Sequence, residues 1–97
     1  MNNRDEYVEK MKAQLDQWNS QMAAWEAATR GATAEAKIEL EKQIGIMKSR
    51  ADDVLYRMEL LKGASADAWQ DVARGADEAR RTMQDAFEKA RHHFKDV

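Results

Sequence analysis

Apolar side chains return about once per helical turn through the first sixty residues of the chain. Their mean spacing is about 3.6 residues, which is the period of a straight α-helix. Only one position in this series, Thr29, is polar. The positions are Met11, Leu15, Trp18, Met22, Trp25, Thr29, Ala32, Ala36, Leu40, Ile44, Met47, Ala51, Val54, Met58 and Leu61. The pattern predicts one long helix face.

A second helical pattern follows after a short interruption. Gly63 comes just after the last apolar position, where a glycine commonly ends a helix, and the side chain of Ser65 can cap the next helix. The later apolar positions are Trp69, Val72, Ala76, Ala79, Met83, Phe87, Ala90 and Phe94. We therefore predict an all-α fold with a helix over about 3–62, a turn at 63–65 and a helix over 66–95.

The two predicted helices are suited to fold back on each other as a long antiparallel hairpin. Residues equally distant from the turn face each other in a hairpin, which places Met47 beside Met83 and large residues beside alanines near both ends. On either side of a one-residue skip near Leu40, the spacing is that of a coiled coil. We expect residues 1–97 to form a single self-associating coiled-coil domain.

This hairpin leaves the first half of the long helix without a partner. The unpaired arm carries several large apolar side chains, each of which contributes roughly 1.5–3 kcal/mol when it is buried. A second copy of the chain would cover the arm in a two-fold arrangement, with one Trp18 near the other. The predicted oligomer interface consists of Val8, Met11, Leu15, Trp18, Met22 and Trp25. The predicted partner is the chain itself, as a dimer or higher homo-oligomer, with another helical protein as the alternative.

A bend at Gly31 is the alternative fold, and it would give a monomeric three-helix bundle. The arm would then cover its own chain, with Trp25 near Leu40 and Trp18 near Met47. A glycine inside a helix is unfavourable by only about 1 kcal/mol relative to alanine. Alanines surround this glycine, and the chain contains no proline. The unbroken helix is therefore the favoured prediction, and the bundle stays open beside it.

Composition limits the classes of function that fit this chain. Charged residues make up 35% of the 97 residues, with 16 lysines and arginines against 18 acids, and the two signs are mixed along the chain. Because no basic patch is present, a nucleic-acid partner is not predicted. The chain has no cysteine, its start turns acidic before any signal-like apolar run, and no run of about eighteen apolar residues occurs. We expect a soluble, cytoplasmic protein.

His92 is the strongest candidate for a metal ligand, because Glu88 and Asp96 each lie four residues away on the same helix face. His93 points about 100° away from it on a helix. Solvated histidines that offset the negative end of the helix dipole are the favoured explanation of the pair. The methionines share faces with the leucines and should pack in the core. No nucleophile with a base and no glycine-rich phosphate loop can be assembled, so we predict no enzyme activity, no cofactor and no dedicated metal site.

Several segments of the chain resemble a bacterial family of short coiled-coil proteins, some of which are described as stress-response proteins. These segments are residues 4–19 (RDEYVEKMKAQLDQWN), 36–44 (AKIELEKQI), 67–71 (DAWQD) and 86–90 (AFEKA). The resemblance covers nearly the whole chain. It implies a cytoplasmic, helical, self-associating protein, and it brings no catalytic residues to this sequence.

These observations favour a non-enzymatic structural or interaction protein that self-assembles through helix packing, with the stress-related role that the resemblance implies. Trp18, Met22 and Trp25 would anchor the association. One alternative is a protein that lays its apolar faces reversibly on a membrane surface. That partner is less favoured, because acids alternate with bases on the polar faces. A second alternative is weak metal handling by His92.

Overall fold

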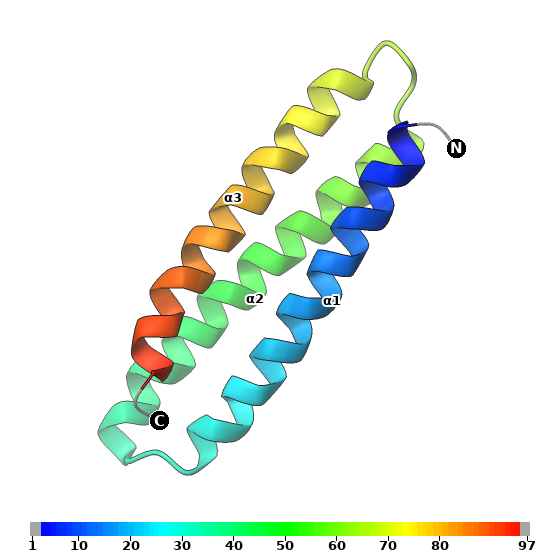
Figure 1. Ribbon diagram of the computed structural model, residues 1–97. Coiled ribbons are helices and arrows are strands. Elements are labelled where there is room, and N and C mark those ends of the chain that lie inside the picture. The colour runs from blue at the N-terminus through cyan, green and yellow to red at the C-terminus, as the bar shows by residue number, and fades with distance from the viewer. Residues whose placement is uncertain (1–2, 96–97) are drawn as a thin grey trace.

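The computed structural model describes residues 3–95, and within that range the chain is a bundle of three α-helices without a strand. The helices are α1 (Asn3–Arg30), α2 (Ala34–Gly63) and α3 (Trp69–Phe94). Figure 1 shows α2 running antiparallel to both α1 and α3, so that α1 and α3 point in the same direction. The bundle measures 51 × 20 × 17 Å. The predicted all-α class is confirmed.

The predicted unbroken helix over 3–62 is wrong, because the chain bends between Arg30 and Ala34. At the end of α1 the amides of Gly31 and Ala32 donate to carbonyls only three residues back, which tightens and closes the helix. Thr33 then adopts an extended backbone (φ −64°, ψ 160°), and its hydroxyl oxygen accepts a hydrogen bond from the amide of Ala36. The three-helix alternative with a bend at Gly31 is therefore the arrangement found.

The second turn is longer than the predicted 63–65. Helix α2 ends at Gly63, and α3 begins at Trp69 rather than at residue 66. The hydroxyl oxygen of Ser65 accepts a hydrogen bond from the amide of Ala68 at 3.2 Å, so this serine caps a turn that precedes the helix. The predicted stop at the glycine is present, whereas the predicted helix start at the serine is wrong, because Ala68 is the N-cap of α3 and provides no side-chain cap.

The core lies along one side of α2, where both other helices pack. Met47 and Val54 have an exposed fraction of 0%, as do Leu61 of α2 and Met83 of α3. Alanines make up much of the buried face of α3, and these short side chains let α3 approach α2 closely. The buried alanines are Ala73, Ala76, Ala79, Ala86 and Ala90. Which residues of α2 face these alanines stays a prediction.

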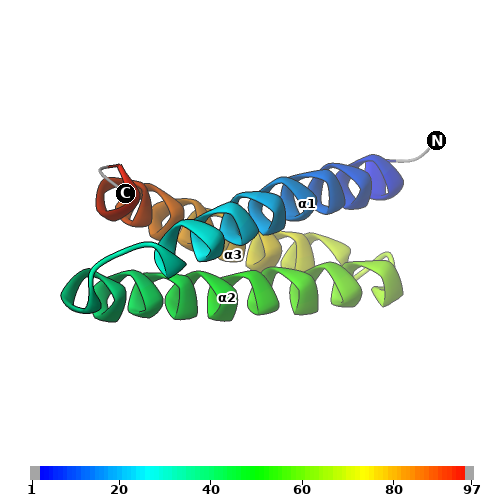
Figure 2. The same ribbon diagram turned by 90° about the horizontal axis from the view of Figure 1, so that it is seen from below.

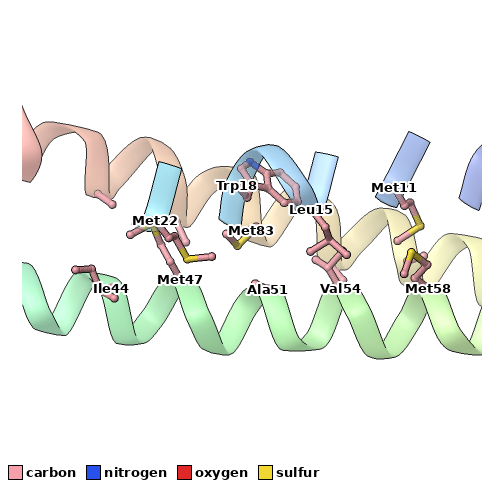
Figure 3. Packing of buried hydrophobic residues seen from close by; sticks show 14 of the residues in the cluster. Met11, Leu15, Trp18, Met22, Ile44, Met47, Ala51, Val54, Met58 and Met83 are labelled. Carbon is pink, nitrogen blue, oxygen red and sulfur yellow. The ribbon is translucent and has the colours of Figure 1, made fainter. Parts of the chain in front are cut away.

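The pairing of α1 with α2 differs from the predicted register by one helical turn. Figure 3 shows Met11 pointing toward Met58 and Leu15 pointing toward Val54. The three-helix alternative placed Trp18 near Met47, whereas Figure 3 shows Met22 at that position. The three-residue link at 31–33 sets where α2 begins, and the sequence pattern does not determine the length of that link. None of the described helices is both long enough and apolar enough to span a membrane.

We expect Thr33→Ala to lower the free energy of unfolding by about 1 kcal/mol, because the first turn of α2 would lose its side-chain cap. Thermal unfolding followed by circular dichroism measures the change. Ser20→Ala is the matched control, since Ser20 lies on the exposed side of α1 and alanine favours a helix interior. Equal midpoints for Thr33→Ala and the native chain would contradict the role of the cap.

Candidate functional site

The residues predicted for an oligomer interface face the interior of the bundle. Met11, Leu15, Trp18 and Met22 are buried, and the remaining two are half-buried against the core. Those two residues are Val8 and Trp25. Helices α2 and α3 of the same chain thus supply the cover that the sequence analysis assigned to a second copy. The physical reason for placing an interface on this face of α1 no longer applies.

Aromatic rings join α1 to α3 near the carboxyl ends of both helices. The ring of Trp25 stacks on Phe94 with a centroid distance of 4.7 Å and an interplanar angle of 4°. Phe87 lies at the same distance from Trp25 with its ring tilted by 34°. Such ring pairs stabilise beyond their buried area. Trp25 therefore holds the bundle together, a role that needs no second chain.

A polar network joins the same two helices near their amino ends. The hydroxyl of Tyr7 donates to Asp77, and Asp77 also accepts from Arg80 at 3.0 Å. Arg80 in turn donates to Gln14 at 2.9 Å, so the network returns to α1. Trp69 lies edge-on to the Tyr7 ring at 6.0 Å. The sequence alone does not identify this network, because its residues lie far apart along the chain.

The environment of Tyr7 changes its acidity. Burial, and then the hydrogen bond to Asp77, raise the pKa of Tyr7 above its usual value of 10.0. Both effects favour the neutral phenol, because the ring is partly desolvated and the neighbouring carboxylate repels a phenolate. Tyr7 therefore acts as a neutral hydrogen-bond donor in the network that links α1 to α3. The network offers no base with a free nucleophile beside it, and we assign it a structural role.

The candidate metal residue His92 lies on the exposed side of α3. It borders an open groove of about 580 Å³ between α2 and α3, which Arg50 and Lys89 also line. Glu88 forms an ion pair with Arg91, and Asp96 lies outside the described residues. Within residues 3–95 no three histidine or acidic side chains gather as a metal site would require. Cations dominate this groove, which disfavours a metal ion there.

The methionines on the apolar helix faces lie in the hydrophobic core. All five of those on the helix faces are buried, and Figure 3 shows them packed among Leu15, Trp18 and Val54. They are Met11, Met22, Met47, Met58 and Met83. The flexible thioether side chains fill the space between three helices that carry many alanines. The core-packing prediction for these residues is confirmed.

The exposed surface carries one apolar feature that the sequence analysis missed. Among the described residues, every large apolar side chain that is exposed belongs to α2. Ile38 and Tyr56 are the most exposed of them, at 73% and 58%. The others are Ile46, Leu55 and Leu60. A single exposed apolar side chain needs no explanation, but here all of these large side chains lie on one helix.

Most of these side chains share the side of α2 that points away from the core, which we name the outer face of α2. The central line of this face repeats at alternating steps of four and three residues, as one side of a helix does. It consists of Ile38, Lys42, Gly45, Ser49, Asp52 and Tyr56, all of which are exposed. Ile46 and Leu60 flank the line. Figure 2 shows α1 and α3 together on the opposite side of α2, so neither helix covers this face.

Gly45 lies at the middle of the outer face. A methyl group added there would have nothing within 4 Å, so the fold of the single chain does not require a glycine at this position. Glycine is nonetheless unfavourable in a helix interior by roughly 1 kcal/mol relative to alanine. The sequence pattern alone assigns no function to Gly45. Gly45 is therefore an exposed helix glycine that the fold of the single chain does not need.

Comparison of the chain with models of known protein families, with curated proteins and with solved structures finds no match. The resemblance to the bacterial coiled-coil family therefore stays a prediction. The candidate site is therefore defined by the contacts and exposure of its own residues.

The Tyr7 network predicts a loss of stability in alkaline solution. The folded-state pKa of Tyr7 is raised, so the stabilisation is fully present below the unfolded pKa of about 10 and is lost as the pH rises through the folded pKa. In Tyr7→Phe this part of the decline above pH 10 should disappear. Urea unfolding at a series of pH values measures it.

Tyr56→Phe is the matched control for this experiment, because the Tyr56 ring is exposed on α2 and takes no part in the network. It should keep the alkaline decline of the native chain. If Tyr7→Phe shows the same decline as Tyr56→Phe, the network does not couple Tyr7 ionisation to folding.

Proposed function

We propose that this protein is a non-enzymatic interaction module that binds another α-helix along the outer face of α2. The single observation that carries the proposal is the confinement of the exposed large apolar side chains, among residues 3–95, to α2. The partner helix would lie along α2 and pack between its side chains, in the manner of a helix pair. This replaces the earlier prediction that Trp18, Met22 and Trp25 are the binding anchors.

The closed core supports an interaction role rather than a chemical one. The largest buried side chains of the bundle are apolar, and Thr29 is the one buried polar residue among those described. Its hydroxyl donates to the carbonyl of Trp25 one turn earlier, so it is satisfied within α1. Catalysis needs polar groups gathered in a shielded pocket. The polar groups of this bundle are instead spread over its surface and along the join between α1 and α3.

The mixed charges around the outer face of α2 favour a protein partner over a lipid surface. Acids such as Asp52, Asp53 and Glu59 lie on or beside this face, together with Lys42. A helix that binds anionic lipid usually has lysines and arginines beside its apolar side chains. A helix of another protein can match both signs of charge. The proposal also includes the stress-related role that the resemblance implies. Helix binding is compatible with that resemblance, because neither of them requires a catalytic group.

A photo-crosslinking amino acid at position 56 should trap a bound partner in bacterial cells that express the chain. Tyr56 is exposed at one end of the central line of the outer face, so a bound helix would lie within reach of the probe. We expect adducts of higher mass on denaturing gels, identified by mass spectrometry. The same probe at Ser20, which is exposed on α1, should give few adducts and is the matched control.

The number of adducts at position 56 should fall several-fold when Ile38→Glu is introduced together with the probe. This change replaces an exposed apolar side chain of the outer face with a charged one. Equal trapping at positions 20 and 56 would contradict the proposed function. Lack of any adduct at position 56 would contradict it as well.

A further inference from the structure

We infer that the helix bound by the outer face of α2 is α2 of a second copy of this chain, in antiparallel orientation about a two-fold axis near Met47. This inference rests on the proposed function and names the partner for that face. It differs from the dimer predicted through Trp18 and Trp25, because those residues lie inside the bundle. It is supported by the order of residues along the outer face, by the exposure of their side chains, and by the lack of partners for the two charged ones within the described part of the chain.

The outer face is complementary to itself when one copy is reversed. In an antiparallel two-fold pair, positions equally far from Met47 on either side face each other. Ile38 then faces Tyr56, so the two most exposed apolar side chains cover each other. Lys42 faces Asp52, which joins opposite charges, and Gly45 faces Ser49. Each of these three contacts occurs twice in the pair.

The small residues stand where the two helices would cross most closely. Gly45 and Ser49 lie next to the two-fold axis, and larger side chains there would hold the helices apart. The open space around Gly45 within its own chain gives no other reason for a glycine at this position. A glycine weakens α2 in the isolated bundle. Close approach of a second α2 accounts for its presence.

The charged residues of the outer face have no partner within the described chain. Among residues 3–95, the side chains of Lys42 and Asp52 form neither an ion pair nor a hydrogen bond. Other charged residues of α2 do have partners, since Lys48 pairs with Glu26 of α1 and Asp53 pairs with Arg57 along α2. Lys42 and Asp52 are the two charged residues on the central line of the outer face, and they meet in the antiparallel arrangement.

A parallel pair would not satisfy the same residues. With two copies of α2 side by side in the same direction, Lys42 would face Lys42 and Asp52 would face Asp52, and like charges at such spacing repel. The antiparallel pair removes both conflicts. The contact strip is narrow, and its buried area should lie below about 1,200 Å², the range of transient complexes. We therefore expect a weak, reversible dimer whose population rises with concentration.

Exchange of the two charges tests the pairing directly. Sedimentation equilibrium of the native chain over a roughly hundredfold range of concentration should show a monomer–dimer equilibrium. Lys42→Glu alone, or Asp52→Lys alone, should weaken the dimer about tenfold, because each creates two repulsive contacts. The double variant, Lys42→Glu with Asp52→Lys, should return to the affinity of the native chain. Lys12→Glu changes an exposed charge on α1 by the same amount and should leave the dimer unaffected.

The outcomes of this experiment separate the inference from the proposed function. A monomer at every concentration, or failure of the double variant to recover, would overturn the antiparallel pairing. The proposed function would still stand if position 56 captured a different protein. Thermal unfolding checks that each variant folds, because both residues are exposed and a change in charge there should leave the bundle intact.

Gly45→Glu should separate folding from association, because it acts on them in opposite directions. The isolated bundle should have a higher unfolding midpoint, since glutamate favours a helix more than glycine and the site is open. The dimer should weaken at least about tenfold, because a long acidic side chain would meet Ser49 and approach Asp52 of the other copy. Midpoints are measured at low concentration and affinities by sedimentation. A rise in both stability and association would overturn the inference.

Discussion

The apolar face of α2 is the surface on which the whole bundle depends. Both α1 and α3 pack on it, and its central residues Met47 and Val54 are fully enclosed. Loss of a buried side chain of this size, such as Met47, destabilises a protein by about 2–5 kcal/mol. Aromatic and polar links between α1 and α3, through Trp25 and Tyr7, complete the bundle from the other side. This face is fully used by its own chain, whereas the outer face of α2 stays exposed.

The bend at residues 31–33 shows how burial overrides local helix preference. The sequence favoured an unbroken helix because alanines surround Gly31. Ordering each residue of a three-residue turn costs about 1–2 kcal/mol of conformational entropy, whereas covering residues such as Trp18 and Met22 returns roughly 1.5–3 kcal/mol each. Burial within one chain needs no second molecule. Once the chain folds back, Thr33 supplies the cap that starts α2.

The helical class and the core positions of α2 followed from periodicity, because a helix repeats its apolar positions regularly. The turn after α2 followed from Gly63, since a glycine commonly ends a helix. The side chains that join α1 and α3 did not follow. Tyr7 and Asp77 are seventy residues apart, and no spacing rule connects them. The outer face of α2 was also missed, since polar and small residues such as Lys42 and Gly45 interrupt its apolar positions. Its apolar character becomes visible only when the core residues of the same helix are accounted for by α1 and α3.

Small-angle X-ray scattering of the chain at low concentration, where the proposed dimer dissociates, tests the closed bundle most directly. The account predicts a compact particle with a radius of gyration close to the 15.5 Å of the Cα atoms and a longest dimension near 51 Å before side chains and hydration are added. An unbroken helix over residues 3–62 would be about 90 Å long at 1.5 Å per residue. A longest dimension of that size would contradict the folding of α1 onto α2 and, with it, the account of which face is free to bind.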